Sequence, residues 1–377
     1  MENNNYCYIH IPFCNKKCSY CRFASLGVSQ KLKIATYVHS LCEEIKNPPV
    51  FYNKGIFPVS LSSVYFWGGT PGVLELSQID QILSTLQEKF IFKENIEISI
   101  ETTPDNVTDS NIQWWKKLGI NRVSMGIQTL NPDSLEEIKR GNKWDIFQAL
   151  QNLENHNFQN VSVDFIIWLP HVKKWEIKKN IQEVLSRFSC IKHVSVYLLE
   201  EYYSPDKIIE TKYDNITYPE NWDSMWLQEE EYLWEYIEVK NFLESQKFIG
   251  YEISNYWKKW FECKHNQAYW SHQNIYSFWL WAYWFLDSMR YRNSESFSDY
   301  YKREKIITEK NSAFDMFLEK IMFLLRTTGI PEEYLSELDN EKINYFIKNN
   351  YLVKKNQTLQ LENKWVLVMD YILSEIV

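Results

Sequence analysis

The chain has 377 residues, of which 45% are hydrophobic and 24% are charged, and its formal net charge is −8 at pH 7. This length and balance are typical of a folded protein with two or three compact units. The negative charge and the lack of a basic stripe argue against a nucleic-acid partner. No apolar run reaches bilayer-spanning length, so we expect a cytoplasmic location and at most peripheral membrane contact.

The first two thirds of the chain alternate β-rich runs with helix-length patterns. Strands are predicted at 8–11, 63–67, 96–101, 122–127, 161–168 and 193–198. Helices are predicted at 31–46, 77–90, 109–117, 132–140, 145–156 and 174–187, with Ser77 and Asp109 as N-caps. Six β/α repeats predict an α/β fold with parallel strands, either barrel-like or doubly wound. In a barrel, functional residues lie at the strand ends, here Gly68, Glu101, Gln128 and Asp164.

The regular alternation of predicted strands and helices ends at residue 213. A charged helix is predicted at 224–245, followed by an aromatic loop and strand region at 250–293. The stretch 312–377 predicts helices, a short hairpin at 352–361 and a last helix, as in a small winged-helix-like module. We therefore expect a core at 1–215, a helical and connecting region at 216–305 and the winged-helix-like module at 306–377. No chemistry is evident in that module, Arg326 included.

Three of the seven cysteines lie within eight residues, which suggests a metal site rather than a disulfide framework. Cys14, Cys18 and Cys21 follow the first predicted strand, and their spacing lets one loop present three thiolates to one iron–sulfur cubane. The fourth iron then stays open to chelate the amino and carboxylate groups of S-adenosylmethionine (SAM). A structural zinc site is disfavoured, because it normally needs four nitrogen or sulfur ligands.

The segment from Tyr8 to Cys21 resembles the opening of the oxygen-independent coproporphyrinogen oxidase and haem-chaperone family of radical-SAM proteins. The resemblance extends over nearly the whole chain and includes Gly68-Gly69-Thr70-Pro71, which is similar to the family's glycine-rich loop. It implies a partial (β/α)6 radical-SAM barrel, followed by a mostly helical C-terminal domain with the winged-helix-like module. It also implies a 4Fe-4S cluster on Cys14, Cys18 and Cys21. The SAM-binding residues that it implies are Tyr8, Tyr20, Gly68, Gly69, Thr70, Glu101, Gln128, Arg140 and Asp164.

Two features of the cluster region favour the haem-chaperone branch of this family. Almost nothing precedes Cys14, whereas the dehydrogenase branch has an N-terminal extension there. In addition, Cys21 is not followed closely by the further cysteine that the dehydrogenase branch carries.

A second motif points to the same branch. His265-Asn266-Gln-Ala-Tyr269-Trp270 resembles the His-Asn-x-x-Tyr-Trp motif of the haem chaperones, which the family links to haem binding. An imidazole can ligate haem iron, and Tyr and Trp rings can pack on a porphyrin face. The alternative is that His265 and Asn266 form a hydrogen-bonded pair that anchors the second domain to the first.

The resemblance implies a protein that binds haem and delivers it to haem-accepting proteins, with the cluster and SAM supporting the transfer. An electron donor for the cluster is implied as a partner. Two alternatives stay open. One is oxygen-independent dehydrogenation of coproporphyrinogen III in porphyrin biosynthesis, which would make the protein an oxidoreductase. The other is a degenerate, non-catalytic paralogue.

Tryptophan is unusually frequent, with 16 Trp against 10 Gly, and it replaces several of the family's glycines. The positions are Trp67, Trp168, Trp279, Trp281, Trp284 and Trp365, with Trp144 and Trp260 as further candidates. Glycine serves where φ is positive or where backbones approach closely, and an indole suits neither. We hypothesise that these codons are UGA, which some bacterial lineages read as glycine. The competing explanation is a degenerate paralogue whose SAM pocket is obstructed, above all by Trp67.

Overall fold

The computed structural model describes residues 4–21, 23, 25–27, 31–48, 58–199, 229–279, 282–286, 289–293, 297–302 and 306–377. The predicted helix at 224–245 is therefore described only as α7 (Glu229–Ser245), and the expected boundary at 215/216 lies outside these ranges. Within the described ranges, no helix combines the length and the apolar character needed to cross a bilayer.

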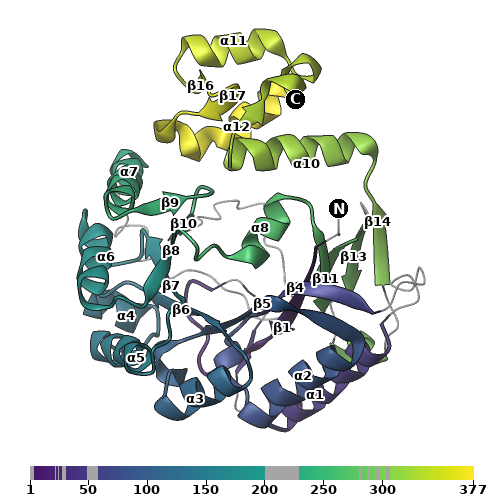
Figure 1. Cartoon of the computed structure of the whole chain (residues 1–377). Helices are drawn as coiled ribbons and strands as arrows, with labels where there is room; N and C mark the ends of the chain where they lie inside the picture. Colours follow the sequence, from purple (N-terminus) through teal and green to yellow (C-terminus); the bar gives the residue numbers. More distant parts are fainter. Residues whose placement is uncertain are drawn as a thin grey trace.

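All six predicted strands are confirmed, and they lie side by side in one parallel sheet (Figure 1). In spatial order they are β1 (Asn5–Ile11), β4 (Val59–Gly68), β5 (Phe90–Thr102), β6 (Arg122–Gln128), β7 (Val161–Ile167) and β8 (Ile191–Leu198). The crossover helices α1 (Lys31–Lys46), α2 (Leu76–Lys89), α3 (Asp109–Lys117), α4 (Pro132–Glu137), α5 (Lys143–Asn155) and α6 (Glu176–Arg187) cover the outer face. This is the expected partial (β/α)6 barrel.

Both predicted N-caps are wrong by one or two residues. The cap of α3 is Thr108, whose hydroxyl accepts a bond from the Asn111 amide at 3.2 Å. The cap of α2 is Glu75, whose amide donates to the Gln78 side chain at 2.9 Å. In both helices the capping hydrogen bond joins residues three positions apart, and the cap lies one or two residues earlier than predicted.

Residues 248–310, which run past the expected boundary at 305/306, add strands to both edges of the core sheet. On the β1 edge lie β11 (Asn274–Phe278), β12 (Tyr283–Leu286), β13 (Met289–Asn293) and β14 (Ile306–Lys310); on the β8 edge lie β10 (Asn255–Lys258) and β9 (Phe248–Gly250). Only β11 runs parallel to its core neighbour. The expected loop and strand region is thus continuous with the core, because its strands form backbone hydrogen bonds with the edge strands β1 and β8.

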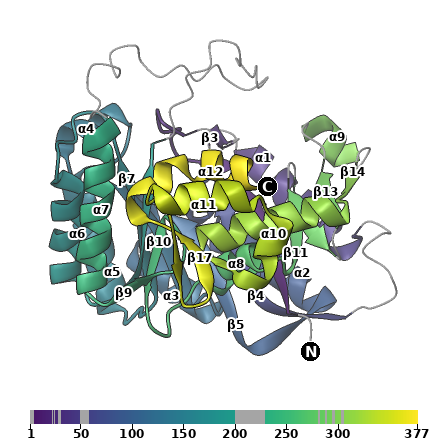
Figure 2. The same ribbon diagram turned by 90° about the horizontal axis from the view of Figure 1, so that it is seen from above.

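The C-terminal module has a hydrophobic core of its own. It contains α10 (Ala313–Arg326), β15 (Ile330–Pro331), α11 (Asn340–Lys348), the predicted hairpin β16 (Leu352–Lys355) and β17 (Thr358–Leu361), and α12 (Met369–Ile376). Figures 1 and 2 show this module, in yellow and light green, lying across the open side of the sheet. It therefore covers the side opposite to helices α1 to α6.

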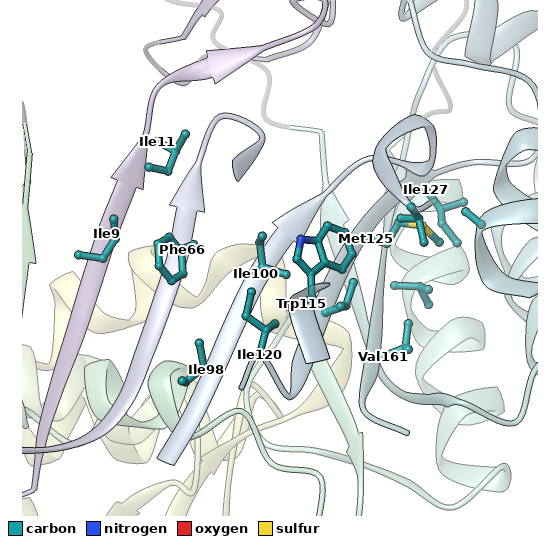
Figure 3. Close-up of a cluster of buried hydrophobic side chains, with 14 of the residues drawn as sticks. Ile9, Ile11, Phe66, Ile98, Ile100, Trp115, Ile120, Met125, Ile127 and Val161 are labelled. Carbon is teal, nitrogen blue, oxygen red and sulfur yellow. The ribbon is translucent and has the colours of Figure 1, made fainter. Parts of the chain in front are cut away.

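Strand alternation separates an apolar outer face of the sheet from a polar inner face. Ile9, Ile98 and Met125 belong to the apolar cluster of the outer face, and Figure 3 shows Met125 close to Trp115 of α3 while Ile9 lies farther along the sheet on β1. On each strand, the residues next to these outward-facing ones point inward, since successive side chains of a strand face opposite sides of the sheet. The inward residues include Tyr8, Tyr65, Glu97, Glu101, Arg122, Ser124, Asp164 and His193, an unusual load of polar groups for buried parallel strands.

Candidate functional site

A cavity of about 2270 Å³ opens at the carboxyl ends of the parallel strands. Its lining contains every residue that the sequence assigned to the cluster and to SAM. These are Cys14, Cys18, Cys21, Tyr8, Tyr20, Gly68, Gly69, Thr70, Glu101, Gln128, Arg140 and Asp164. Of the second motif, Asn266, Tyr269 and Trp270 line the same cavity, whereas His265 does not. The fold thus joins two motifs that lie more than 240 residues apart.

The cysteine loop is tied to the body of the protein on both sides. Cys14 ends the short strand β2 (Phe13–Cys14) and accepts a weak bond from the Thr70 hydroxyl at 3.5 Å. Further along, the Ser19 amide and hydroxyl donate to the carbonyls of Ile138 and Glu137 at 3.4 and 3.0 Å. These bonds hold the three thiols against one wall of the cavity.

The electrostatics of the thiols suit an iron–sulfur cluster. Burial, together with the neighbouring Cys18 and Cys14, raises the pKa of Cys21 to about 11, although a backbone hydrogen bond and Arg140 act in the opposite direction. Buried thiolates so close together need a cationic partner, which the irons of a cluster provide. In the described part of the chain, no three Cys, His, Asp or Glu side chains converge on a single-ion site. Three thiols on one loop are the ligand set that a cubane with one open iron takes, as the cysteine spacing predicts.

Gly68 and Gly69 are required by two different neighbours, because a Cβ on Gly68 would lie 2.5 Å from the His10 ring of β1, whereas Gly69 faces the start of the cysteine loop. A Cβ on Gly69 would lie 2.7 Å from the Phe13 carbonyl oxygen, and Gly68 has a φ of +113°. The amides of Gly69 and Thr70 donate to the carbonyls of Ile11 and Phe13 at 2.8 and 2.7 Å. The resemblance implies that these glycines bind SAM. Their first physical task is to bring β4 close to β1 and to the cysteine loop.

The SAM-assigned polar residues form a set of donors and acceptors around the cavity. Arg140 donates to the Tyr20 hydroxyl at 3.0 Å, and within the described residues its buried Nε and Nη1 have no hydrogen-bond partner. The Tyr65 hydroxyl donates to Glu101 at 3.0 Å. Unsatisfied guanidinium donors beside buried carboxyl groups suit a ligand that carries a carboxylate, an amino group and hydroxyls. SAM is such a ligand.

Burial also changes the pKa values of two carboxyl groups in this wall of the cavity. It raises the pKa of Asp164 to about 6, although Ser195, Arg122 and Arg140 act in the opposite direction. It raises the pKa of Glu101 well above its usual range, and the charge of Asp164 adds to this effect. Both groups therefore gain from a ligand that donates hydrogen bonds or brings positive charge.

The second motif forms the short helix α8 (Lys264–Trp270). His265 is fully buried behind the cavity wall, where its Nδ1 is hydrogen-bonded to the Ser63 hydroxyl at 2.8 Å. Burial and the charge of Arg122 lower its pKa to about 3. The Asn266 side chain donates to the Tyr251 hydroxyl at 3.1 Å. Instead of bonding to each other, the two residues anchor α8 to different parts of the fold.

Sequence reasoning missed the residues beneath α8. The Glu97 carboxylate of β5 accepts the Lys264 and His265 amides at 3.0 and 3.3 Å, which caps the helix. Arg122 of β6 is buried nearby and lies 5.9 Å from the centre of the Tyr65 ring. The available signal was the polar alternation along β5 and β6, which departs from the apolar runs of buried parallel strands.

Several of the questioned tryptophans have glycine-like backbone geometry. Trp168, Trp260 and Trp279 have φ values of +82°, +77° and +123°, and Trp175, which the sequence did not single out, has +68°. Within the described residues, thirteen non-glycine positions have positive φ, of which four are Trp and three Asn. A bulky residue is rare in this region, so this enrichment supports glycine at these codons.

The remaining positions behave differently. Trp67 lies in the cavity wall in ring contact with Tyr8 and Tyr65, and Trp284 is buried. Trp365 stacks on Tyr351 with ring centres 4.1 Å apart. The last position, Trp281, lies outside the described residues.

Known proteins show the same combination of parts. The family model described as "Radical SAM superfamily" matches residues 8–184. The haem chaperone HemW of Lactococcus lactis is 27% identical over 381 residues, which cover 97% of this chain and 95% of the relative. HemW of Synechocystis is 30% identical over 338 residues, 85% of this chain and 78% of the relative. The solved structure of Escherichia coli coproporphyrinogen III oxidase (HemN), a radical SAM enzyme, is similar with a TM-score of 0.80 at 19% identity. The match covers 99% of this chain and 90% of the HemN chain.

These similarities carry different weight. The likeness to HemN shows the fold, because 19% identity is too low to carry an activity. The Synechocystis match extends well beyond the matched radical SAM region, and the structure places both motifs around one cavity. The chain therefore belongs to the HemW family of radical SAM proteins.

Proposed function

We propose that this protein binds haem in the cavity between the cysteine loop and α8 and delivers it to haem-accepting proteins. Family membership implies a 4Fe-4S cluster and SAM, which together supply an electron and a cleavable sulfonium when bound. The relatives are named haem chaperones, and that function is carried to this chain here. An electron donor for the cluster belongs to the same proposal.

The observation that carries the proposal is the size and lining of the cavity. A typical ligand pocket holds roughly 300–1,000 Å³, whereas this cavity has about 2270 Å³. It therefore has room for SAM at the cysteine loop and for a second, larger ligand at α8. Tyr269 and Trp270 offer aromatic surface on that second side, as a planar porphyrin requires.

Within this proposal the four motif residues have different roles. Asn266, Tyr269 and Trp270 contact the haem from the cavity wall. His265 holds α8 against β4 through Ser63, and its imidazole reaches an iron only if α8 moves. Cys263 is equally buried, so neither side chain is an iron ligand in the present arrangement.

The proposal is tested with anaerobically purified, cluster-reconstituted protein. Absorbance titration with haem should give saturable binding, and mixing with an apo-haem protein should transfer the haem. Trp270→Ala should weaken binding, whereas Trp114→Ala, an exposed aromatic of α3 that does not line the cavity, should leave it unchanged. Incubation with coproporphyrinogen III and SAM distinguishes the alternative. Appearance of protoporphyrinogen would replace the chaperone assignment by the dehydrogenase.

A further inference from the structure

Arg326 is held in an unusual way at the junction between the C-terminal module and the cavity. It ends α10, and its Nε donates to the Glu252 carboxylate at 3.0 Å. Its guanidinium carbon lies 5.1 Å from the centre of the Trp270 ring. The side chain is 30% exposed and lines the cavity. One edge and one face of the guanidinium are thus fixed, which pre-organises the group.

Arg326 lines the cavity, and the described residues leave the other edge of its guanidinium unpaired. Among the residues that the structure describes, Nη1 and Nη2 of Arg326 have no hydrogen-bond partner. Glu252 also accepts bonds from the Ser254 amide and the Asn255 side chain, both at 2.7 Å. Three donors therefore share the charge of this carboxylate, and the guanidinium keeps the parallel N–H groups of Nη1 and Nη2 for a second acceptor.

The position of Arg326 among the lining cations is the second observation. The other cationic residues of the described cavity wall are Lys16, Lys17, Lys139 and Arg140, which belong to the cysteine loop and to the SAM-assigned side. On the side of α8 and the C-terminal module, Arg326 is the cation that the described lining provides. It stands beside Trp270, the aromatic surface on which the proposed function places a porphyrin.

We propose that Arg326 recognises a propionate carboxylate of the tetrapyrrole whose ring lies against Tyr269 and Trp270. This inference rests on the proposed function and names the group that orients the bound ligand. Two parallel N–H groups match the two oxygens of a carboxylate, and the partly desolvated wall strengthens the pair. The guanidinium then bridges Glu252, which docks the module, and the ligand. Tetrapyrrole binding is thereby linked to the position of the C-terminal module.

The experiment compares two ligands that differ only in free carboxylates. Full-length protein is titrated by absorbance with iron protoporphyrin IX and with its dimethyl ester, which keeps the ring and the iron. The native protein should prefer the free acid. Arg326→Gln should weaken binding of the free acid by about 10- to 100-fold, as for loss of a charged hydrogen-bonded pair. It should leave binding of the ester unchanged.

Two further variants separate recognition from docking. Arg326→Gln alone leaves the Glu252 carboxylate without its cation, so the double variant E252Q/R326Q replaces the ion pair by two neutral amides. It should show the same loss of preference for the free acid. Lys320→Gln removes a cation from the same helix outside the cavity lining and should bind like the native protein.

The outcomes distinguish this inference from the function on which it rests. Equal loss of acid and ester binding in both Arg326 variants would mean that Arg326 only docks the module. An unchanged acid-to-ester ratio would also overturn the inference, while leaving haem binding in place. If the native protein bound neither ligand, the proposed function would fail and this inference with it.

Discussion

Replacement of Trp260 by glycine should stabilise the protein, although it removes a whole indole. Trp260 is 79% exposed and has a φ of +77°, so it gains little from burial and carries backbone strain. Trp144 is a matched control, because it is 73% exposed but lies in the first turn of α5 with helical geometry. The same chemical change therefore meets opposite backbone requirements.

The magnitudes follow from the local geometry. Left-handed backbone costs a non-glycine residue roughly 1–2 kcal/mol. Against this, Trp260→Gly loses an exposed contact with Lys259, whose Nζ lies 4.7 Å from the ring centre, worth about 0.5 kcal/mol. We expect the free energy of unfolding to rise by about 1 kcal/mol. Trp144→Gly places glycine in a helix and loses an edge contact with Phe147, so the free energy of unfolding should fall by about 1 kcal/mol.

The assay is urea unfolding of both variants and of the chain as written, followed by fluorescence and circular dichroism. The coding DNA and the peptide masses of the native protein complete it, at Trp168, Trp175, Trp260 and Trp279, with Trp115 as the control. UGA codons and glycine masses are expected at the four positions with positive φ. Destabilisation by Trp260→Gly as large as by Trp144→Gly, together with UGG codons, would refute the reasoning and favour a degenerate paralogue.

Three further outcomes are expected. Cys14→Ser should abolish the absorbance of the reconstituted cluster, because two thiolates of one loop cannot hold three irons. Trp67→Gly should tighten SAM binding in calorimetry, because the indole occupies the cavity wall beside Tyr8; unchanged affinity would show that the pocket is not obstructed. His265 has a folded-state pKa of about 3, below the usual value, so stability is fully present above about pH 6.5 and is lost as pH falls. When the pH falls from about 7 to about 5, the free energy of unfolding of the native protein should drop by about 2 kcal/mol. Unfolding titrations of His265→Gln should not show this drop.

The α/β repeat was predictable because local pattern decides it. The six core strands and their crossover helices between Asn5 and Leu198 overlap the predicted runs, since each buries one apolar face, whereas the two-residue strands Phe13–Cys14 and Leu26–Gly27 were not predicted. The caps at Glu75 and Thr108 were missed because neighbouring polar residues compete for the same amides. The strands of the region 216–305 were assigned to a separate region because pairing partners far along the chain leave no local signal.

The sequence by itself determined the chemistry of the site. Three cysteines in one loop, a Gly-Gly pair and the His-Asn-x-x-Tyr-Trp motif are short-range patterns, and their spacing is a property of the chain alone. Only the tertiary structure decided which of these side chains share a cavity. It buries His265 behind the cavity wall and brings Trp270 into contact with Arg326 of the C-terminal module. It also gives Trp168 and Trp279 the positive φ angles that are typical of glycine. Those relations depend on burial and on contacts between distant segments, which are set when the sheet closes and the C-terminal module covers it.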